Sequence, residues 1–160
     1  MYHHLRNRLD GLLKENNLHI YPEFYFKDLK FRADLAIVEM DFEKDVYDLR
    51  DCFTDVLAII EFKLAGGNSK ATENYIKSDM PKIKEYAKNL NYSCQYYFGA
   101  IYETECERLN WFTQRQTENW AKDCVTELNA GYENDKMIFE VNSYNSLNCR
   151  YGSKECDIKF

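Results

Sequence analysis

The sequence lacks the features that mark fibrous, disordered and membrane-spanning chains. Only 2 prolines and 6 glycines occur among its 160 residues, which excludes a collagen-like or linker-like chain. Its longest apolar run surrounds Val56–Ile60, whereas a membrane helix needs about 18 apolar residues. Residues 1–6 also lack the apolar region of a signal peptide. We therefore expect a cytoplasmic protein that does not enter a membrane.

The cysteines lack the spacing of a zinc ribbon, because no two of them form a CxxC pair. A secreted disulfide framework would require a secretion signal, so free thiols are expected. The six cysteines are Cys52, Cys94, Cys106, Cys124, Cys149 and Cys156.

The chain also lacks an excess of positive charge. Its formal net charge is −6, so the overall field does not attract nucleic acid or anionic membranes. Much of this charge lies in Glu39–Asp55, which holds seven acidic and two basic residues, and the remainder of the chain is nearly neutral. A hydrophobic fraction of 45% and an aromatic fraction of 16% are ample for a packed core. The length suits one domain over residues 1–160.

The pattern of apolar residues predicts two kinds of element in the order α-β-β-β-α-β-α-β. This order indicates an α/β (α+β) protein with a mixed sheet and helices on its faces. Pro81 is expected to kink the long helix or to start a second one. The predicted elements are a helix over 2–16, strands Leu18–Phe26, Lys30–Val38 and Asp55–Leu64, a helix Ser69–Leu90, a strand Gln95–Glu103, a helix Gln116–Asn129 and a strand Lys136–Asn142.

Charged residues interrupt two of the predicted apolar strands. Asp34 stands in the string RADLAIV, and Glu61 and Lys63 stand in the string IIEFK. Because side chains alternate along a strand, Glu61 and Lys63 point to the same face. If the two strands are neighbours, the three side chains converge at one place on the sheet. A charge in a covered strand is costly unless it is paired or binds a metal.

Two interpretations of these charges are open. In the structural one, Glu61 forms an ion pair with Lys63 or Arg32 at the end of the sheet. In the chemical one, two carboxylates bind Mg²⁺, which takes oxygen ligands and keeps several waters. A lysine two residues later would then orient or deprotonate a water for attack on phosphorus.

The arrangement of Asp34 followed by Glu61-Phe62-Lys63 on consecutive strands, after a helix, resembles the PD-(D/E)XK nuclease superfamily. The resemblance covers roughly residues 1–103 and implies a restriction-endonuclease-like α-β-β-β-α-β core. It further implies that Asp34 and Glu61 bind Mg²⁺, for which Mn²⁺ can substitute. The Phe62 carbonyl would be a further ligand and Lys63 the catalytic lysine. Members of this superfamily mostly cut DNA.

The chain departs from the pattern of the superfamily at two points. Ala33 stands where the family name has proline, a position that varies among members. Asp34 and Glu61 are 27 positions apart, more than a tight hairpin needs. The acidic segment fills this gap and is expected to form a loop or an extended hairpin near one edge.

Other residues are weaker candidates for the same site. Glu23, in the first strand, would be an additional catalytic acid near the metal or simply a carboxylate at the rim of the sheet. Glu15 competes with it for that role. Asp79 is expected to have a structural role, either capping the turn at Pro81 or binding Lys82.

Two features would contact the nucleic acid rather than the metal. Lys77, Lys84 and Lys88 lie at offsets 0, 7 and 11 in the long helix, which fits a phosphate-contacting stripe but more often a solvated helix face. Gln95, at the start of the fourth strand, is a candidate for contact near the bond that is cut.

The sequence thus predicts a Mg²⁺-dependent nuclease that acts on DNA, built on a core of about 1–103 with a C-terminal extension over 104–160. The alternative is a non-catalytic module of the same fold that binds protein or nucleic acid. A chemistry based on one of the cysteines ranks last. A domain this small can act as a homodimer, with two sites that cut both strands of a duplex.

Overall fold

The structure is a computed structural model, and it describes residues 2–44, 47–48, 51–65, 69–90, 94–103, 119–121 and 124–143. Within these ranges the fold is α+β, with a six-stranded mixed sheet and two α-helices. The elements are α1 (Tyr2–Glu15), β1 (Leu18–Phe26), β2 (Phe31–Met40), β3 (Phe53–Ala65), α2 (Ser69–Asn89), β4 (Gln95–Tyr102), the short 3-10 helix η2 (Asn119–Ala121), β5 (Val125–Glu133) and β6 (Lys136–Ser143).

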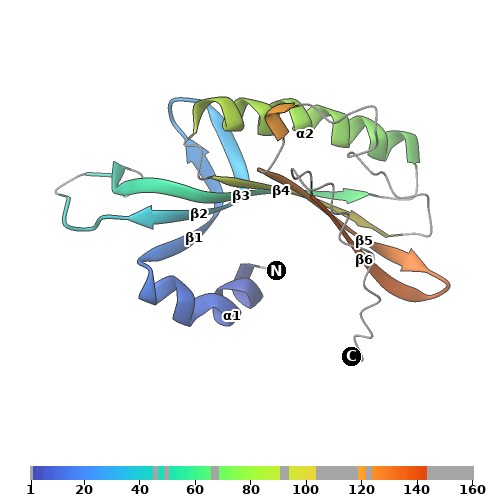
Figure 1. The fold of residues 1–160 in the computed structure, drawn as a ribbon, viewed down its shortest axis with the longest axis horizontal. Helices are drawn as coiled ribbons and strands as arrows, with labels where there is room; N and C mark the ends of the chain where they lie inside the picture. Colours follow the sequence, from blue (N-terminus) through green and yellow to red (C-terminus); the bar gives the residue numbers. More distant parts are fainter. Residues whose placement is uncertain are drawn as a thin grey trace.

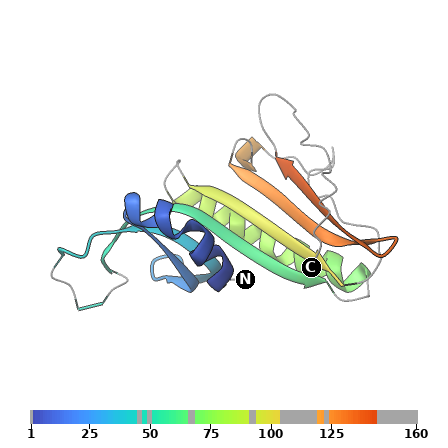
Figure 2. The same cartoon turned by 90° about the horizontal axis from the view of Figure 1, so that it is seen from below.

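The strands follow one another across the sheet in chain order, from β1 to β6. Strands β1, β2 and β3 are antiparallel, β3, β4 and β5 are parallel, and β5 and β6 form an antiparallel hairpin. The two helices lie on opposite faces of the sheet, with α2 over one face and α1 against the other (Figure 1). Figure 2 shows α2 running along β3 and β4, the parallel pair that it connects.

The predicted order of elements up to β4 is confirmed. Strands β2 and β3 extend further toward their connection than the predicted strands, which ended at Val38 and began at Asp55. Met40 pairs with Phe53, and the backbone amide of Asp41 donates a hydrogen bond to the Cys52 carbonyl. The acidic segment therefore belongs largely to an extended hairpin, as expected, and this hairpin projects beyond the helices in Figure 1. Pro81 lies inside a single helix and does not divide it into two.

The predicted helix over Gln116–Asn129 is wrong in its second half. Val125–Glu133 is strand β5, in which buried Val125, Glu127 and Asn129 alternate with half-buried residues. Spacings of four residues from Trp120 to Leu128 imitated a helical face, but pairing with strands on both sides decides the conformation. The predicted final strand, Lys136–Asn142, is confirmed as β6.

A two-residue turn joins β5 to β6. Asn134 and Asp135 have positive φ angles of 50° and 59°. Two consecutive left-handed residues form the turn that suits the twist of a hairpin, and Asn and Asp tolerate this conformation best after glycine. Residues 104–118, 122–123 and 144–160 lie outside the described part, so most of the predicted C-terminal extension is not placed.

The main hydrophobic core lies between the sheet and α2. Ile59 of β3, Ile83 and Tyr86 of α2, and Phe98 of β4 are fully or almost fully buried there. A smaller cluster on the opposite face joins Leu13 of α1 to β1 and β2. Since burial of each large apolar side chain stabilises the fold by about 1.5–3 kcal/mol, α2 is the helix that contributes most to holding the sheet.

Strand β1 forms one edge of the sheet and carries an irregularity in its middle. Pro22 pairs with Leu35 and Phe24 pairs with Ala33, whereas Glu23 between them has a φ of 52°. This left-handed residue reverses the alternation, because Ile20 packs toward α1 and Phe24 packs into the main core under α2.

Two further expectations concern cysteines and membranes. Cys52, Cys94 and Cys124 are free thiols, and the other three cysteines lie outside the described residues. Within the described ranges, neither helix combines the length and the apolar character that crossing a bilayer requires.

Candidate active site

Glu61 lies at the centre of the sheet on the face covered by α2. Its register positions place it beside Phe98 of β4, and it follows Ile60, which pairs with Leu35 of β2. Strand β3 is otherwise apolar here, so the fold carries this carboxyl group into the core, where only 1% of Glu61 is exposed. Burial of a carboxylate at such a position is costly unless partners compensate for the lost hydration.

Asp34 lies next to Glu61, as the sequence predicts for neighbouring strands. The Phe62 backbone amide donates a hydrogen bond of 2.7 Å to Asp34 Oδ2. This bond ties the aspartate of β2 to the main chain of β3 immediately after Glu61. Asp34 and Glu61 are close enough for the charge of one to raise the pKa of the other.

Helix α2 places two further charged side chains against β3. Lys82 Nζ donates a hydrogen bond of 2.8 Å to Glu61 Oε2, and Lys63 Nζ lies 2.8 Å from Asp79 Oδ2. Asp79, Lys82 and Tyr86 follow one another at helical spacing beside the buried Met80 and Ile83. We call Asp34, Glu61, Lys63, Asp79 and Lys82 the charged cluster; it joins three acidic and two basic groups.

Two members of the charged cluster, Glu61 and Lys63, have shifted pKa values. Burial raises the pKa of Glu61 to about 7, although the hydrogen bond and charge of Lys82 act in the opposite direction. Burial also works against a charged Lys63, but the hydrogen bond and charge of Asp79 outweigh it and raise the pKa. Lys63 therefore remains an ammonium group at neutral pH.

Glu61 Oε1 is one of the cluster oxygens that lack a hydrogen bond of good geometry among the described residues. Glu61 Oε2 is bound by Lys82, and the Tyr86 hydroxyl lies within interaction range of the same carboxyl group. A buried carboxylate oxygen normally accepts at least one bond. A hard cation held between Asp34 and Glu61 would satisfy it, so these residues fit a magnesium site of two carboxylates, a main-chain carbonyl and water.

The described residues contain no group of three or more His, Cys, Asp or Glu side chains placed to hold a metal ion. Such a group would mark a cage built entirely from side chains, as structural zinc and calcium sites use. Magnesium is usually held by only one or two carboxylates, with water completing its shell.

The ion pairs differ from the structural interpretation of the sequence. Glu61 pairs with Lys82, and not with Lys63 or Arg32 as that interpretation proposed. Asp79 binds Lys63, where the sequence suggested Lys82 or a cap. Two ion pairs, Lys82–Glu61 and Asp79–Lys63, therefore connect α2 to β3.

The secondary candidates lie outside the charged cluster. Glu23 points to Arg32, 3.5 Å away, and both side chains are exposed at the β1 edge of the sheet. Glu15 is exposed at the end of α1, on the other face of the sheet. Gln95 is exposed and pairs with Ala58, three residues before Glu61. Of the residues predicted for the site, the structure brings together Asp34, Glu61 and Lys63.

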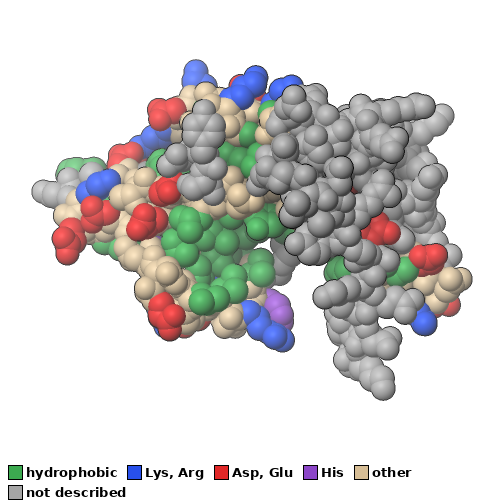
Figure 3. All heavy atoms as spheres, viewed as in Figure 1, with side chains coloured by type: hydrophobic (Ala, Val, Ile, Leu, Met, Phe, Trp, Pro, Cys, Tyr) green, Lys and Arg blue, Asp and Glu red, His purple; other side chains and the backbone are tan. Residues whose placement is uncertain are grey.

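The lysines of α2 have separate roles. Lys88 is exposed and bonded to Glu85 at 2.6 Å, and Lys84 lies 5.7 Å from the centre of the Trp120 ring. The side chain of Lys77 lies outside the described residues. Figure 3 shows Lys and Arg side chains along the outer side of the molecule where α2 runs, in keeping with a solvated helix face.

Sequence reasoning missed two buried polar residues on the same face of the sheet. Glu127 lies beside Phe98 in the row that contains Glu61, and Asn129 lies beside Ala100 one row further. Both are at most 1% exposed, and Asn142 of β6 donates a hydrogen bond of 3.3 Å to Glu127. The Asn134-Asp135 turn, which marks β5 and β6 as a hairpin, was the available signal.

Comparison of the chain with protein-family models, with curated proteins and with solved structures gave no match. The geometry of the charged cluster is therefore the basis of the functional argument.

Proposed function

We propose that the protein is a metal-dependent nuclease that hydrolyses phosphodiester bonds in DNA, with the charged cluster as its active site. The observation that carries this proposal is the buried carboxylate of Glu61 within electrostatic reach of Asp34, with Lys82 bound to only one of its two oxygens. A structure optimised for stability alone would place an apolar side chain at this position. The restriction-endonuclease-like core is part of the same proposal and is supported by the α-β-β-β-α-β order up to β4.

In this mechanism Asp34 and Glu61 hold Mg²⁺, with the carbonyl of Phe62 as the further ligand that the resemblance implies. When bound, the ion supplies Lewis-acid stabilisation of negative charge on the phosphate oxygens. The Phe62 amide holds Asp34 in position through the 2.7 Å bond. This bond leaves the other oxygen of Asp34 available toward Glu61.

Lys63 acts on the attacking water and on the phosphate as a cation. Since its pKa is raised, it donates hydrogen bonds and does not remove a proton at neutral pH. Asp79 holds the ammonium group in place at 2.8 Å. The lysine therefore orients the water and stabilises the charge that develops on the phosphate.

A second candidate function is a non-catalytic module of the same fold that binds protein or nucleic acid. Its specific support is that both lysines of the charged cluster are already paired, Lys63 with Asp79 and Lys82 with Glu61. In such a module the cluster would be a structural network between α2 and β3. The two candidates differ in whether cleavage depends on metal and on Glu61.

Cleavage assays distinguish the nuclease from the non-catalytic module. They compare purified wild type with Glu61→Gln and Lys63→Met, and Lys88→Met is the matched control. Each is tested with Mg²⁺ or Mn²⁺ on supercoiled plasmid and on single-stranded DNA. We expect both site variants to lose at least about 100-fold in cleavage rate, because each removes a group that acts on the reacting phosphate. Lys88→Met, which breaks an exposed pair on the same helix, should cleave as wild type does.

Circular dichroism and thermal unfolding of each variant establish that it is folded. Isothermal titration of Mn²⁺ should show binding to wild type that is lost in Glu61→Gln. Metal-independent DNA binding without turnover would favour the non-catalytic module. Cleavage that survives in both site variants would refute the proposed active site.

A further inference from the structure

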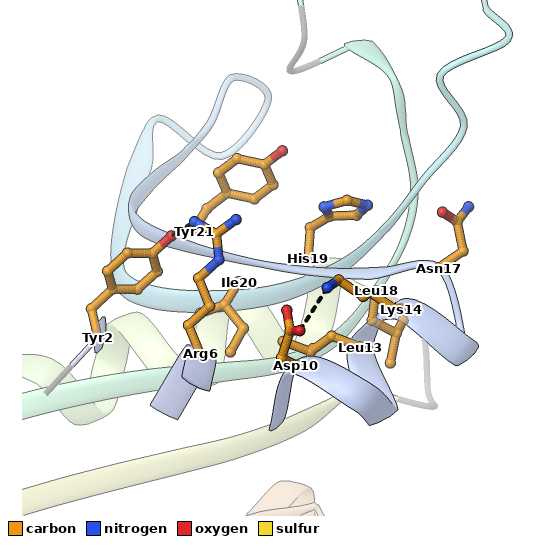
Figure 4. A pocket seen from close by; sticks show the side chains of 10 residues that line it. All are labelled: Tyr2, Arg6, Asp10, Leu13, Lys14, Asn17, Leu18, His19, Ile20 and Tyr21. Atoms are coloured by element: carbon orange, nitrogen blue, oxygen red, sulfur yellow. Dashed lines mark hydrogen bonds and ion pairs between the residues drawn. The ribbon is translucent and has the colours of Figure 1, made fainter. Parts of the chain in front are cut away.

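A groove lies between α1 and β1, at the edge of the sheet. It encloses about 300 Å³, and buried Leu13 and Ile20 lie at its base. Figure 4 shows Tyr2 and Arg6 rising from the helix on one side and His19 and Tyr21 from the strand on the other. We call it the α1–β1 groove. Its volume is at the lower end of the range for small-molecule sites.

Arg6 and Tyr2 reach from α1 toward the edge strand β1 (Figure 4). Arg6 Nη1 donates a single hydrogen bond to Tyr2 Oη, and this bond is long, at 3.3 Å. Burial raises the pKa of Tyr21, and the positive charge of Arg6 lowers it. A guanidinium group carries five N–H donors, and most of those of Arg6 remain available to a ligand.

The net charge of the groove comes from Arg6. Lys14 also lines it, but Asp10 neutralises this lysine through a 2.7 Å ion pair, drawn as a dashed line in Figure 4. One guanidinium beside the Tyr2 hydroxyl suits a single phosphate, which guanidinium groups bind in a bidentate manner.

Two flat rings lie just beyond the groove, on the side of β1 that faces away from α1 (Figure 4). His19 and Tyr21 share this side of the strand, with ring centres 6.3 Å apart and planes 28° apart. Phe42 from the β2–β3 hairpin closes against the edge of His19 at 5.0 Å. Aromatic rings near a cationic side chain are the usual elements that bind single-stranded nucleic acid, since bases stack on the rings while the cation contacts the backbone.

We infer that the α1–β1 groove binds one nucleotide of a single-stranded nucleic acid, with its phosphate on Arg6 and its base against Tyr21 and His19. A duplex would present stacked base edges rather than free base faces. The role of this contact in holding a substrate rests on the proposed nuclease function, whereas the binding itself does not.

The position of the groove fits that role. Tyr21 pairs with Ala36, and Ala36 pairs with Ile59, two residues before Glu61. Two strand spacings across the sheet and two residues along it separate Tyr21 from Glu61 by roughly 12 Å between Cα atoms. Tyr21 packs against the main core under α2, so a strand that bends around the edge of β1 onto its ring would lie on the face of the charged cluster.

Fluorescence anisotropy with a labelled short oligothymidylate, in EDTA and at low salt, tests this inference. Wild type, Arg6→Gln and Arg6→Lys are compared with the control Arg8→Gln. Arg8 is exposed on α1 two residues along, so it points away from Arg6. We expect Arg6→Gln to weaken binding at least about tenfold and Arg6→Lys less, because a lysine retains the charge but not the bidentate fork. Arg8→Gln should stay within about twofold of wild type.

A second variant tests the stacking part. Tyr21→Leu should weaken binding at least about fivefold, the lower end of what one stacked base contributes. Equal losses in Arg6→Gln and Arg8→Gln, absence of binding by wild type, or tighter binding of duplex than of single strand would each overturn the inference. Because binding is measured in EDTA, where no metal-dependent cleavage takes place, its loss in Arg6→Gln separates this inference from the proposed catalysis.

Discussion

On strand β3, a charged side chain is buried on one face and an apolar side chain is exposed on the other. On the α2 face, Glu61 is 1% exposed, and on the other face Leu64 is 63% exposed. The hydrophobic effect alone would favour the reverse, since burial stabilises the leucine and costs the carboxylate its hydration. The α2 face of this strand is therefore arranged around a charge, and we regard the charged cluster as the reason.

The largest expected effect is a dependence of the free energy of unfolding on pH, caused by the buried Glu61. The pKa of Glu61 is raised from 4.5 to about 7 in the folded protein, so the folded state binds this proton more tightly than the unfolded state. The free energy of unfolding should therefore fall as the pH rises from about 4.5 to 7, by about 3 kcal/mol from this group. Urea unfolding of wild type and Glu61→Gln across this range measures it, and the variant should lack this part of the slope.

Substitution of Lys82 tests how much its ammonium group on α2 stabilises the buried Glu61 carboxylate. Lys82→Met leaves Glu61 buried without its cation and should destabilise the protein by about 2 kcal/mol at pH 8. The loss should shrink below pH 6, because a protonated carboxyl no longer needs the ammonium group. Lys88→Met should change stability by less than about 0.5 kcal/mol, because its pair is exposed.

Metal binding by Lys82→Met sharpens this prediction. Without the ammonium group, Mn²⁺ should bind more tightly than in wild type and should recover the lost stability, which thermal unfolding with and without Mn²⁺ measures. Unchanged affinity would mean that Lys82 does not compete for Glu61.

The opposite face of β3 has its own close contact. A Cβ at Gly99 would lie 2.6 Å from the Phe62 ring, so the ring occupies the place of the missing side chain. We expect Gly99→Ala to displace the ring and to destabilise the protein by about 1–2 kcal/mol. Chemical denaturation measures this, and Gly11→Ala is the control, because nothing lies within 4 Å of that position. A stabilised Gly99→Ala would show that the ring moves without cost.

The smallest effect is expected at Leu64 itself. Leu64→Thr keeps a good strand former at an exposed position, so unfolding should change by less than about 0.5 kcal/mol. The variant should also cleave DNA as wild type does, because residue 64 points away from the charged cluster. A large loss of stability would show that another part of the chain or a second molecule covers this face.

Local patterns in the sequence were sufficient for the N-terminal part of the fold. The alternation in β1 and β2 and the helical period of α2 are local signals, and they placed Asp34, Glu61 and Lys63 on neighbouring strands. β5 could not be recognised in this way, because spacings at Trp120, Cys124 and Leu128 suit both a helix and a strand. Only pairing with β4 and β6 distinguishes them.

The partners within the site were less predictable than its members. The sequence shows that Glu61 and Lys63 share a face, but not which lysine reaches the carboxylate. That depends on how α2 is rotated over the sheet, which brings Lys82 to Glu61 and Asp79 to Lys63. Rotation of a helix on a sheet is set by packing of residues such as Ile83 and Tyr86, and this cannot be read from periodicity alone.

The irregularity in β1 bears on how separate molecules behave toward one another. An aromatic strand at the rim of a sheet is a template on which strands of other molecules assemble. Here Pro22 has no N–H to offer, and the left-handed backbone of Glu23 turns the strand at its midpoint. An incoming strand therefore meets two short segments instead of one continuous edge, which protects the protein from polymerising through β1.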